Sequence, residues 1–324
     1  MDEPVGWIDA DRYLDELKQG MYRPEGTWIA EDDGRIVGRS LWWGQQDSAH
    51  PVALDCLHVD PTLPDRAEVA AGLRLALHAE WTKVRTVVGP LWLLLGTVAA
   101  TVALSTVATS VVHCTASGCG GDTTKVTLMG IYLGQALVAI LAVQIISGEY
   151  SSGMIRTTLT AISRRATVFA AKAVVLTGVV AVDGTVAVLG SVLAGRLILP
   201  YLGDRALSMS DGPTLRAVFG TVLYLILIGL LSLGTATAVR DSATSIGIVL
   251  GLLYIVPIVS QTIGDPHWQR LFQKFAPMNA GLAIQATTDL PGLPISPWAG
   301  LGVTAGWAAA ALLAGALLLR IRDA

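Results

Sequence analysis

The pattern of apolar and polar residues divides the chain into a polar N-terminal region and a long apolar remainder. Crossing about 30 Å of hydrocarbon takes roughly 20 residues of α-helix, and six stretches reach that length. They are residues 88–112, 127–147, 168–195, 215–239, 244–264 and 297–319. Because backbone polar groups inside a bilayer have to be satisfied within the segment, we expect six membrane-spanning helices packed as one bundle.

The first 66 residues have shorter periodic segments and predict a small α/β region. Alternating apolar runs bounded by turn residues indicate strands, and a helical pattern precedes them. The expected elements are a helix over 9–18 and strands over 26–31, 34–43 and 51–59. Asp32, Asp33 and Gly34 provide hairpin-turn chemistry between the first two strands.

Residues 67–87 join this region to the first span. Val69, Leu73, Leu77 and Val84 recur at helical spacing, and Trp81 is a residue type typical of the membrane surface. We therefore expect an amphipathic interfacial helix here. The alternative is a plain linker.

Composition agrees with a membrane protein: 52% of residues are apolar, 15% are charged, and mean hydropathy is +0.58. An ordinary soluble globule is excluded.

Residues 1–87 hold 16 of the 25 acidic and 9 of the 22 basic residues, so the remainder has 9 acids and 13 bases. With a net charge of −3 and no dense basic run, nucleic-acid binding is not expected. The first thirty residues predict no cleavable secretory signal.

The flanks of the spans predict the orientation. Nine Lys and Arg residues flank one side against six on the other, and four of the nine form a cluster between the second span and the first residues of the third, at Arg156, Arg164, Arg165 and Lys172. Since basic residues favour the cytoplasmic side, we expect both termini in the cytoplasm.

Four segments carry a resemblance to a known family. They read LALHAEWTKVR (75–85), ISGEYSSGMIR with the following TTLTAISRRATVFAAKAVV (146–175), AVRDSATSIGIVLGLLYIVPI (238–258) and FQKFAPMNAGLAI (272–284). In this order they resemble the permease subunits of ABC-2 type ABC transporters. The resemblance implies an exporter of an amphipathic compound, drug or lipid in the bacterial cell membrane, with a second permease subunit and two ATPase subunits as partners. Whether that second subunit is identical stays open.

No phosphate-binding loop of the form G-x-x-x-x-G-K-[ST] occurs in this sequence. We therefore expect this chain to bind no cofactor and to have no ATPase site of its own. ATP and Mg²⁺ would bind to the partner ATPase.

The segment between the second and third spans is the expected ATPase-coupling site. It combines an acid and several bases with hydroxyl groups over 148–167, and the resemblance makes it the helix that docks on the ATPase. The coupling residues we expect are Glu149, Tyr150, Gly153, Arg156, Arg164 and Arg165. In the alternative interpretation, these charges only set the topology.

Three polar residues within spans are candidates for the substrate pathway: Asp183, Gln135 and Gln144. An intramembrane carboxylate is costly and has to face protein or water, so Asp183 is either functional or a structural group hydrogen-bonded by Thr177 or Thr185. Nine residues separate the two glutamines, which places them on opposite faces of one helix. Hydrogen bonding between helices is the alternative role for each.

Cys114 and Cys119 lie in the predicted first external loop, where an oxidising environment would permit a disulfide. His113 and Asp122 nearby raise a metal site as an alternative, although this spacing is not typical of zinc sites. No metal site is predicted.

The N-terminal segment YRPEGTWIAEDDGRIVGRSLWWG, with ALDCLHVDP after it, resembles the first half of a GNAT acetyltransferase. The glycine loop that would bind the acetyl-CoA pyrophosphate is missing. Acetyltransferase activity is therefore not expected, although a membrane-anchored N-acetyltransferase and a non-enzymatic membrane assembly factor remain alternative functions.

Together these features predict a mainly α membrane protein, a six-helix transmembrane bundle with a small α/β N-terminal cytoplasmic half-domain. The predicted domains are a truncated GNAT-like region (1–66), the interfacial helix (67–87) and a six-span permease domain (88–324).

Overall fold

The computed structural model describes most of the apolar part of the chain and short pieces of the N-terminal region. The described residues are 15, 17–19, 28–32, 35–43, 53–59, 73, 74, 76–78, 80–84, 88–111, 114, 115, 118, 119, 122–152, 165–202, 211–262 and 264–321. The chain divides into two compact units. One comprises Met1–Val88, Gly148–Val175 and Leu318–Ala324, and the other comprises Gly89–Ser147 and Leu176–Leu317.

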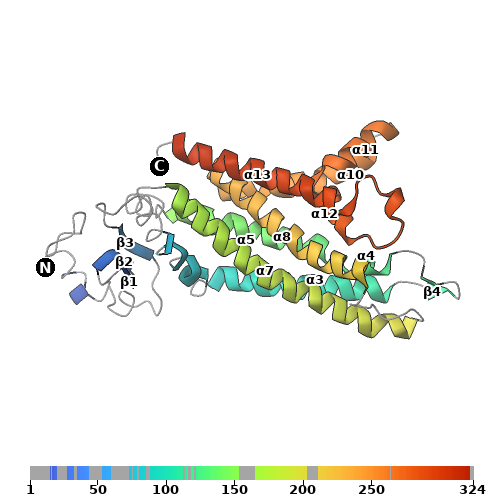
Figure 1. Cartoon of the computed structure of the whole chain (residues 1–324), viewed down its shortest axis with the longest axis horizontal. Coiled ribbons are helices and arrows are strands. Elements are labelled where there is room, and N and C mark those ends of the chain that lie inside the picture. Colours follow the sequence, from blue (N-terminus) through green and yellow to red (C-terminus); the bar gives the residue numbers. More distant parts are fainter. Residues whose placement is uncertain are drawn as a thin grey trace. The chain divides into compact units, whose positions relative to one another are not determined.

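Within the described residues, six helical segments are long and apolar enough to cross a membrane (Figure 1). They are α3 (Val88–Ser110), α5 (Ile131–Ser152), α7 (Arg165–Ile198), α8 (Gly212–Val239), the composite of α9 (Ser242–Leu250), η3 (Gly251–Ile255) and α10 (Val256–Thr262), and α13 (Pro297–Ile321). The protein is thus a mainly α, multi-pass membrane bundle, as the apolar pattern predicted.

The boundaries differ from the prediction at several ends. Residues 127–130, expected within the second span, instead belong to the end of the short helix α4 (Thr123–Thr127) and a turn. At its other end α5 continues to Ser152, and α7 exceeds the predicted third span at both ends. Helices often extend beyond the hydrocarbon, because their backbone hydrogen bonding does not stop where the apolar residues do.

The fifth span is irregular at its centre. Its residues 251–255 form the π-helical turn η3, two residues before Pro257. Proline has no N–H to donate to the preceding turn, so regular α-helical bonding is interrupted there. Such π-turns occur often at functional sites.

Small residues allow α3 and α5 to approach closely. A Cβ atom at Gly130 would lie 1.9 Å from the backbone oxygen of Thr101, and one at Gly134 would lie 2.3 Å from the Thr101 hydroxyl. The Gly130 N–H donates to the Ser105 Oγ at 3.1 Å. This Gly-x-x-x-Gly pair therefore serves packing inside the bundle.

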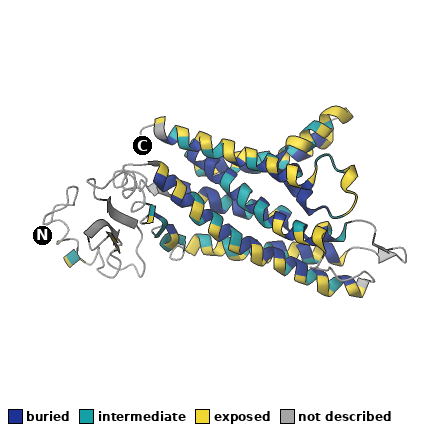
Figure 2. Ribbon diagram, viewed as in Figure 1, coloured by how far each residue is buried: buried dark blue, intermediate teal, exposed yellow. Residues whose placement is uncertain are grey.

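Helix α8 is the most buried span, and dark blue residues line it in Figure 2. The space beside Gly229 is filled by Val138, Leu176 and Val180 from α5 and α7, and Gly234 lies against the α13 backbone at Ala311. Three other spans thus pack around α8.

Short elements connect the fifth and sixth spans. They are α11 (Pro266–Phe275), α12 (Pro277–Leu282), and the 3₁₀ turns η4 (Ala283–Gln285) and η5 (Leu290–Gly292). Helix α12 and η4 are buried, whereas no residue of α11 is. A further 3₁₀ turn, η2 (Leu199–Leu202), follows α7.

The N-terminal strands form an antiparallel sheet in the order β1–β2–β3, with β1 at Trp28–Asp32, β2 at Arg35–Trp43 and β3 at Ala53–Val59. These bounds agree with the predicted strands to within two residues. Asp32 pairs with Arg35, so the connection falls at the predicted hairpin turn. The predicted helix over 9–18 lies largely outside the described residues, of which Asp15, Leu17 and Lys18 are helical.

Candidate functional site

The interior of the bundle contains a hydrogen-bonded group of polar side chains centred on Gln135. Gln135 of α5 is fully buried, and Tyr224 of α8, also fully buried, donates its hydroxyl to the Gln135 Oε1. The Gln135 Nε2 lies 3.2 Å from the Met278 Sδ of α12. One buried amide thus links two spans to the short helix between the fifth and sixth spans.

The irregular fifth span contributes to the same region. Tyr254 of η3 donates its hydroxyl to the backbone oxygen of Tyr132, one turn before Gln135 on α5. That contact ties the π-helical turn to α5. A change in the shape of this turn would therefore be transmitted to the helix that carries Gln135.

Asp183 lies on the buried face of α7, as an intramembrane carboxylate requires. Its Oδ2 has no hydrogen-bond partner among the described residues. Of the two threonines considered as partners of Asp183, Thr185 donates its hydroxyl to the Ala181 oxygen of its own helix at 2.6 Å. A threonine hydroxyl reaches the preceding turn of its helix more readily than a side chain two residues away.

Packing contacts place Asp183, Gln135 and Tyr224 at a similar level of the bundle. Gly184 lies against Leu225, and Gly229 lies against both Val138 and Val180. Asp183 is one position from Gly184, Tyr224 is one position from Leu225, and Gln135 is three positions from Val138. At 1.5 Å per residue, their backbones lie within about 5 Å of a common level. We call Gln135, Tyr224 and Asp183 the polar layer.

Gln144 does not belong to the polar layer. It is exposed on α5, whereas Gln135 is buried, as the half-turn offset between them requires.

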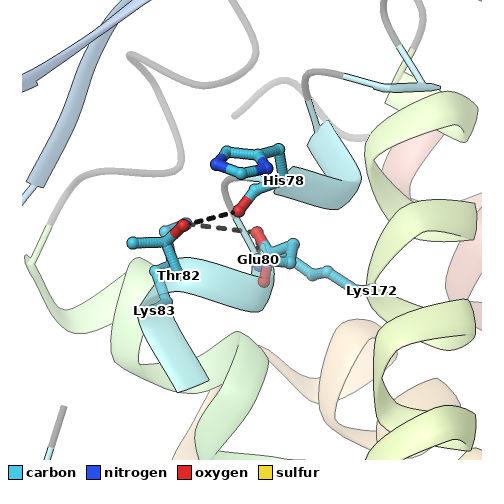
Figure 3. A network of polar contacts seen from close by, with 5 residues as sticks. All are labelled: His78, Glu80, Thr82, Lys83 and Lys172. Atoms are coloured by element: carbon cyan, nitrogen blue, oxygen red, sulfur yellow. Dashed lines mark hydrogen bonds and ion pairs between the residues drawn. The ribbon is translucent and has the colours of Figure 1, made fainter. Parts of the chain in front are cut away.

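A buried ion pair lies near the start of α7, within the compact unit that includes residues 1–88 and 148–175 (Figure 3). The Lys172 Nζ donates to the Glu80 Oε1 at 2.8 Å, and the Lys83 Nζ lies 3.1 Å from the same oxygen. Glu80 and Lys172 are 5% and 1% exposed, so water screens their attraction little. The pair connects the helical residues 73–84 to the third span.

The helical residues around Glu80 agree in part with the predicted interfacial helix. Trp81 is 49% exposed, as expected of a side chain at a membrane surface. Thr82 donates to the His78 oxygen at 2.9 Å within this helix. Of the predicted apolar face, Leu73, Leu77 and Val84 are half-buried.

Most of the expected coupling residues lie outside the described part of the chain. Glu149 and Tyr150 belong to the last turn of α5 and Arg165 begins α7, but their side chains are not described. Gly153, Arg156 and Arg164 fall within 153–164, wholly outside the described residues.

The predicted external loop contains a two-stranded ladder of β4 (Cys114–Thr115) and β5 (Gly118–Cys119), in which Cys114 is opposite Cys119. Cα atoms of opposite antiparallel residues are close enough for a disulfide, so the disulfide remains a prediction.

Asp122 has a different role from the metal ligand considered above. It caps α4 through the Lys125 N–H and accepts the Thr287 hydroxyl at 2.7 Å. The described residues contain no cluster of three or more metal-binding side chains.

Several residues of these networks were not identified from the sequence. Tyr224, Met278 and Tyr254 lack a distinctive motif, and their contacts span large sequence separations. For Lys172 there was a signal, since a lysine inside a span needs an acidic partner. The sequence alone did not single out Glu80 as that partner.

Compared with known proteins, the chain matches no family model and no curated sequence.

Proposed function

We propose that this chain is the permease subunit of an ATP-driven exporter of the ABC-2 type in the bacterial cell membrane, with both termini in the cytoplasm. It pairs with a second permease subunit and takes its energy from separate ATPase subunits that hold ATP and Mg²⁺. Its substrate is an amphipathic small molecule or a lipid.

The Glu80–Lys172 pair is the observation that carries this proposal. Lys172 follows the start of α7 by two helical turns, and α7 begins within the last residues of the proposed coupling segment. The ion pair fastens helical residues 73–84 to that start. A displacement of the coupling segment by an ATPase would therefore move the third span and the helix before the first span together.

The polar layer supports a pathway for a substrate with a polar group. Gln135 and Tyr224 offer donors and acceptors, and the Asp183 carboxylate has an oxygen that no described residue engages. Polar groups at this depth are retained at a free-energy cost, which transport would explain. The apolar residues around them suit the hydrocarbon part of an amphipath.

Reconstitution with the ATPase encoded beside its gene provides the test. We expect the chain to change the rate of ATP hydrolysis in liposomes, and Glu149→Ala or Arg156→Ala to abolish that change. Arg196→Ala is the matched control, since this exposed residue lies at the opposite end of α7 from the coupling segment. An ATPase that neither binds the chain nor responds to it would contradict the proposal.

A segment replacement tests the coupling site itself. Exchanging residues 148–167 for a neutral linker is expected to remove ATPase binding, as measured by co-purification. Undiminished binding would contradict the assignment of this segment while leaving the transporter proposal intact.

A further inference from the structure

Helix α11, between the fifth and sixth spans, has an aromatic face that no part of the described chain covers. Trp268, Leu271, Phe272 and Phe275 follow the i, i+3, i+4, i+7 spacing of one helical face. Trp268 is 56% exposed, Phe272 39% and Phe275 60%. Figure 2 shows no buried residue in the helix that Figure 1 labels α11.

The aromatic side chains of α11 are exposed, whereas two of its uncharged polar side chains are not. Gln269 and Gln273 are half-buried, as is Leu271, whereas Trp268 and Phe275 are exposed. An amphipathic helix on a soluble protein does the reverse and buries its apolar stripe. The aromatic face of α11 therefore points away from its own chain, toward an apolar medium or another molecule.

The charges of α11 are all of one sign. Arg270 and Lys274 are exposed and four residues apart, and no acidic residue lies within Pro266–Phe275. The acidic Asp265 caps the helix by accepting the His267 N–H at 2.8 Å. Basic residues opposite a face that contains Trp and Phe are characteristic of helices at the surface of an anionic membrane.

Both ends of α11 are connected to membrane spans. The fifth span ends at Thr262, four residues before α11 begins. At the other end, the Trp307 Nε1 of the sixth span donates to the Phe275 oxygen at 2.9 Å, and Thr304 donates to the Pro277 oxygen at 3.0 Å. The fifth span by a short connection and the sixth span by two hydrogen bonds thus hold α11 beside the bundle.

We propose that α11 lies in the membrane surface, with its aromatic face among the acyl chains and with Arg270 and Lys274 binding the phosphates of anionic phospholipids. The bilayer already covers the adjoining spans, so it extends over this face without a separate partner. The long side chains of Arg and Lys reach the headgroups while the rings stay in hydrocarbon.

Spin labelling of the full chain tests the placement. With its three cysteines replaced by serine, the chain is labelled in turn at Trp268→Cys, Phe272→Cys, Phe275→Cys and Lys274→Cys in liposomes of phosphatidylcholine and phosphatidylglycerol. We expect the three aromatic positions to be accessible to oxygen and protected from a water-soluble nickel complex, with the opposite result at Lys274→Cys. Access of the nickel complex to every position would overturn the proposal. Protection from both reagents with spin–spin broadening would also overturn it, by showing a second copy on this face.

Tryptophan fluorescence tests the same placement in a chain whose three cysteines are unchanged. The emission lost in Trp268→Phe gives the Trp268 signal by difference, and brominated phospholipids quench it if the ring lies among acyl chains. We expect stronger quenching by brominated phosphatidylglycerol than by brominated phosphatidylcholine at equal mole fraction. No quenching by either lipid would overturn the membrane placement.

Neutralising the basic residues isolates the phosphate interaction. In the Arg270→Gln/Lys274→Gln variant, the selectivity for phosphatidylglycerol is expected to fall about fivefold for each charge removed. The selectivity of the parent chain should also weaken with salt. Arg196→Gln is the matched control, since it removes an exposed basic residue outside α11. Selectivity equal to that of the parent chain in the double variant would overturn the assignment of Arg270 and Lys274.

Discussion

Two buried polar networks among the described residues connect helices through different chemistry. In the polar layer, Gln135 and Tyr224 form a bond between neutral groups, whereas Glu80 and Lys172 form a bond between charges. A neutral pair leaves a modest penalty when one member is lost, because an uncharged group loses little solvation. A charged pair leaves a bare ion in a medium of low dielectric. The charged network is therefore suited to a permanent connection, and the neutral one to a contact that can break and reform.

The largest predicted effect follows from breaking the charged pair. Glu80→Leu removes a carboxylate that the buried Lys172 ammonium contacts at 2.8 Å and should destabilise the protein by about 3–5 kcal/mol. Thermal unfolding of the purified chain, followed by fluorescence, measures this. In Glu80→Leu/Lys172→Met both charges are absent, so most of the lost stability should return. A single variant as stable as the parent would show that the pair does not form.

A smaller effect is expected from the neutral pair. Tyr224→Phe removes the hydroxyl that donates to the buried Gln135 and should lower the free energy of unfolding by about 1–3 kcal/mol. The same unfolding measurement applies. Gln144→Leu is the control, because its exposed side chain should tolerate the change with little loss. Equal destabilisation by both variants would remove the distinction between the two glutamines.

Substitution of Asp183 is expected to affect transport more than stability. Since its Oδ2 has no partner among the described residues, Asp183→Asn should change stability by less than about 1 kcal/mol, within the usual range of a mild substitution. Under the proposed function, the same change should reduce substrate-stimulated ATP hydrolysis in the reconstituted exporter. A large loss of stability with unchanged stimulation would instead mark Asp183 as structural.

The smallest effect concerns an exposed charge, Asp241, which caps α9. The hydrogen bond from the Thr244 side chain, followed by that from the Thr244 N–H, lowers the pKa of this carboxyl below its ordinary value. A lowered pKa stabilises the folded state at pH values above the ordinary pKa, and this contribution is lost as pH falls through the lowered pKa. The protection of amides in the first turn of α9 against hydrogen exchange, relative to their intrinsic exchange rate at each pH, should therefore fall in acid. Asp241→Asn, which caps without titrating, should show no such loss of protection.

Local pattern accounts for much of the fold. The six spans and the three strands follow from runs of apolar residues and from Asp32, Asp33 and Gly34, because burial in lipid or in a sheet constrains each segment separately. The local pattern does not show whether a given polar residue within a span is buried or exposed. Gln135 and Gln144 are the same residue type on one helix, and helical geometry alone shows that they lie on opposite faces without indicating which one is buried.

The candidate sites depended more on the fold than on the sequence. Asp183 stood out because a carboxylate is rare in a span, but the sequence did not show that the Thr185 hydroxyl donates to its own helix. The phenol of Tyr224 and the thioether of Met278 became significant only when α8 and α12 met Gln135. Nothing local to those residues distinguishes them from ordinary core side chains.

By itself, the sequence determined that this chain spans a membrane with six helices, since an apolar run of sufficient length has no other stable solvent. It also determined the aromatic spacing of α11. Only the tertiary structure decided that Glu80 pairs with Lys172, that Gln135 rather than Gln144 is buried, and that the aromatic face of α11 points outward. Such outcomes depend on which helices pack together, and packing between distant segments is a property of the whole bundle rather than of any one segment.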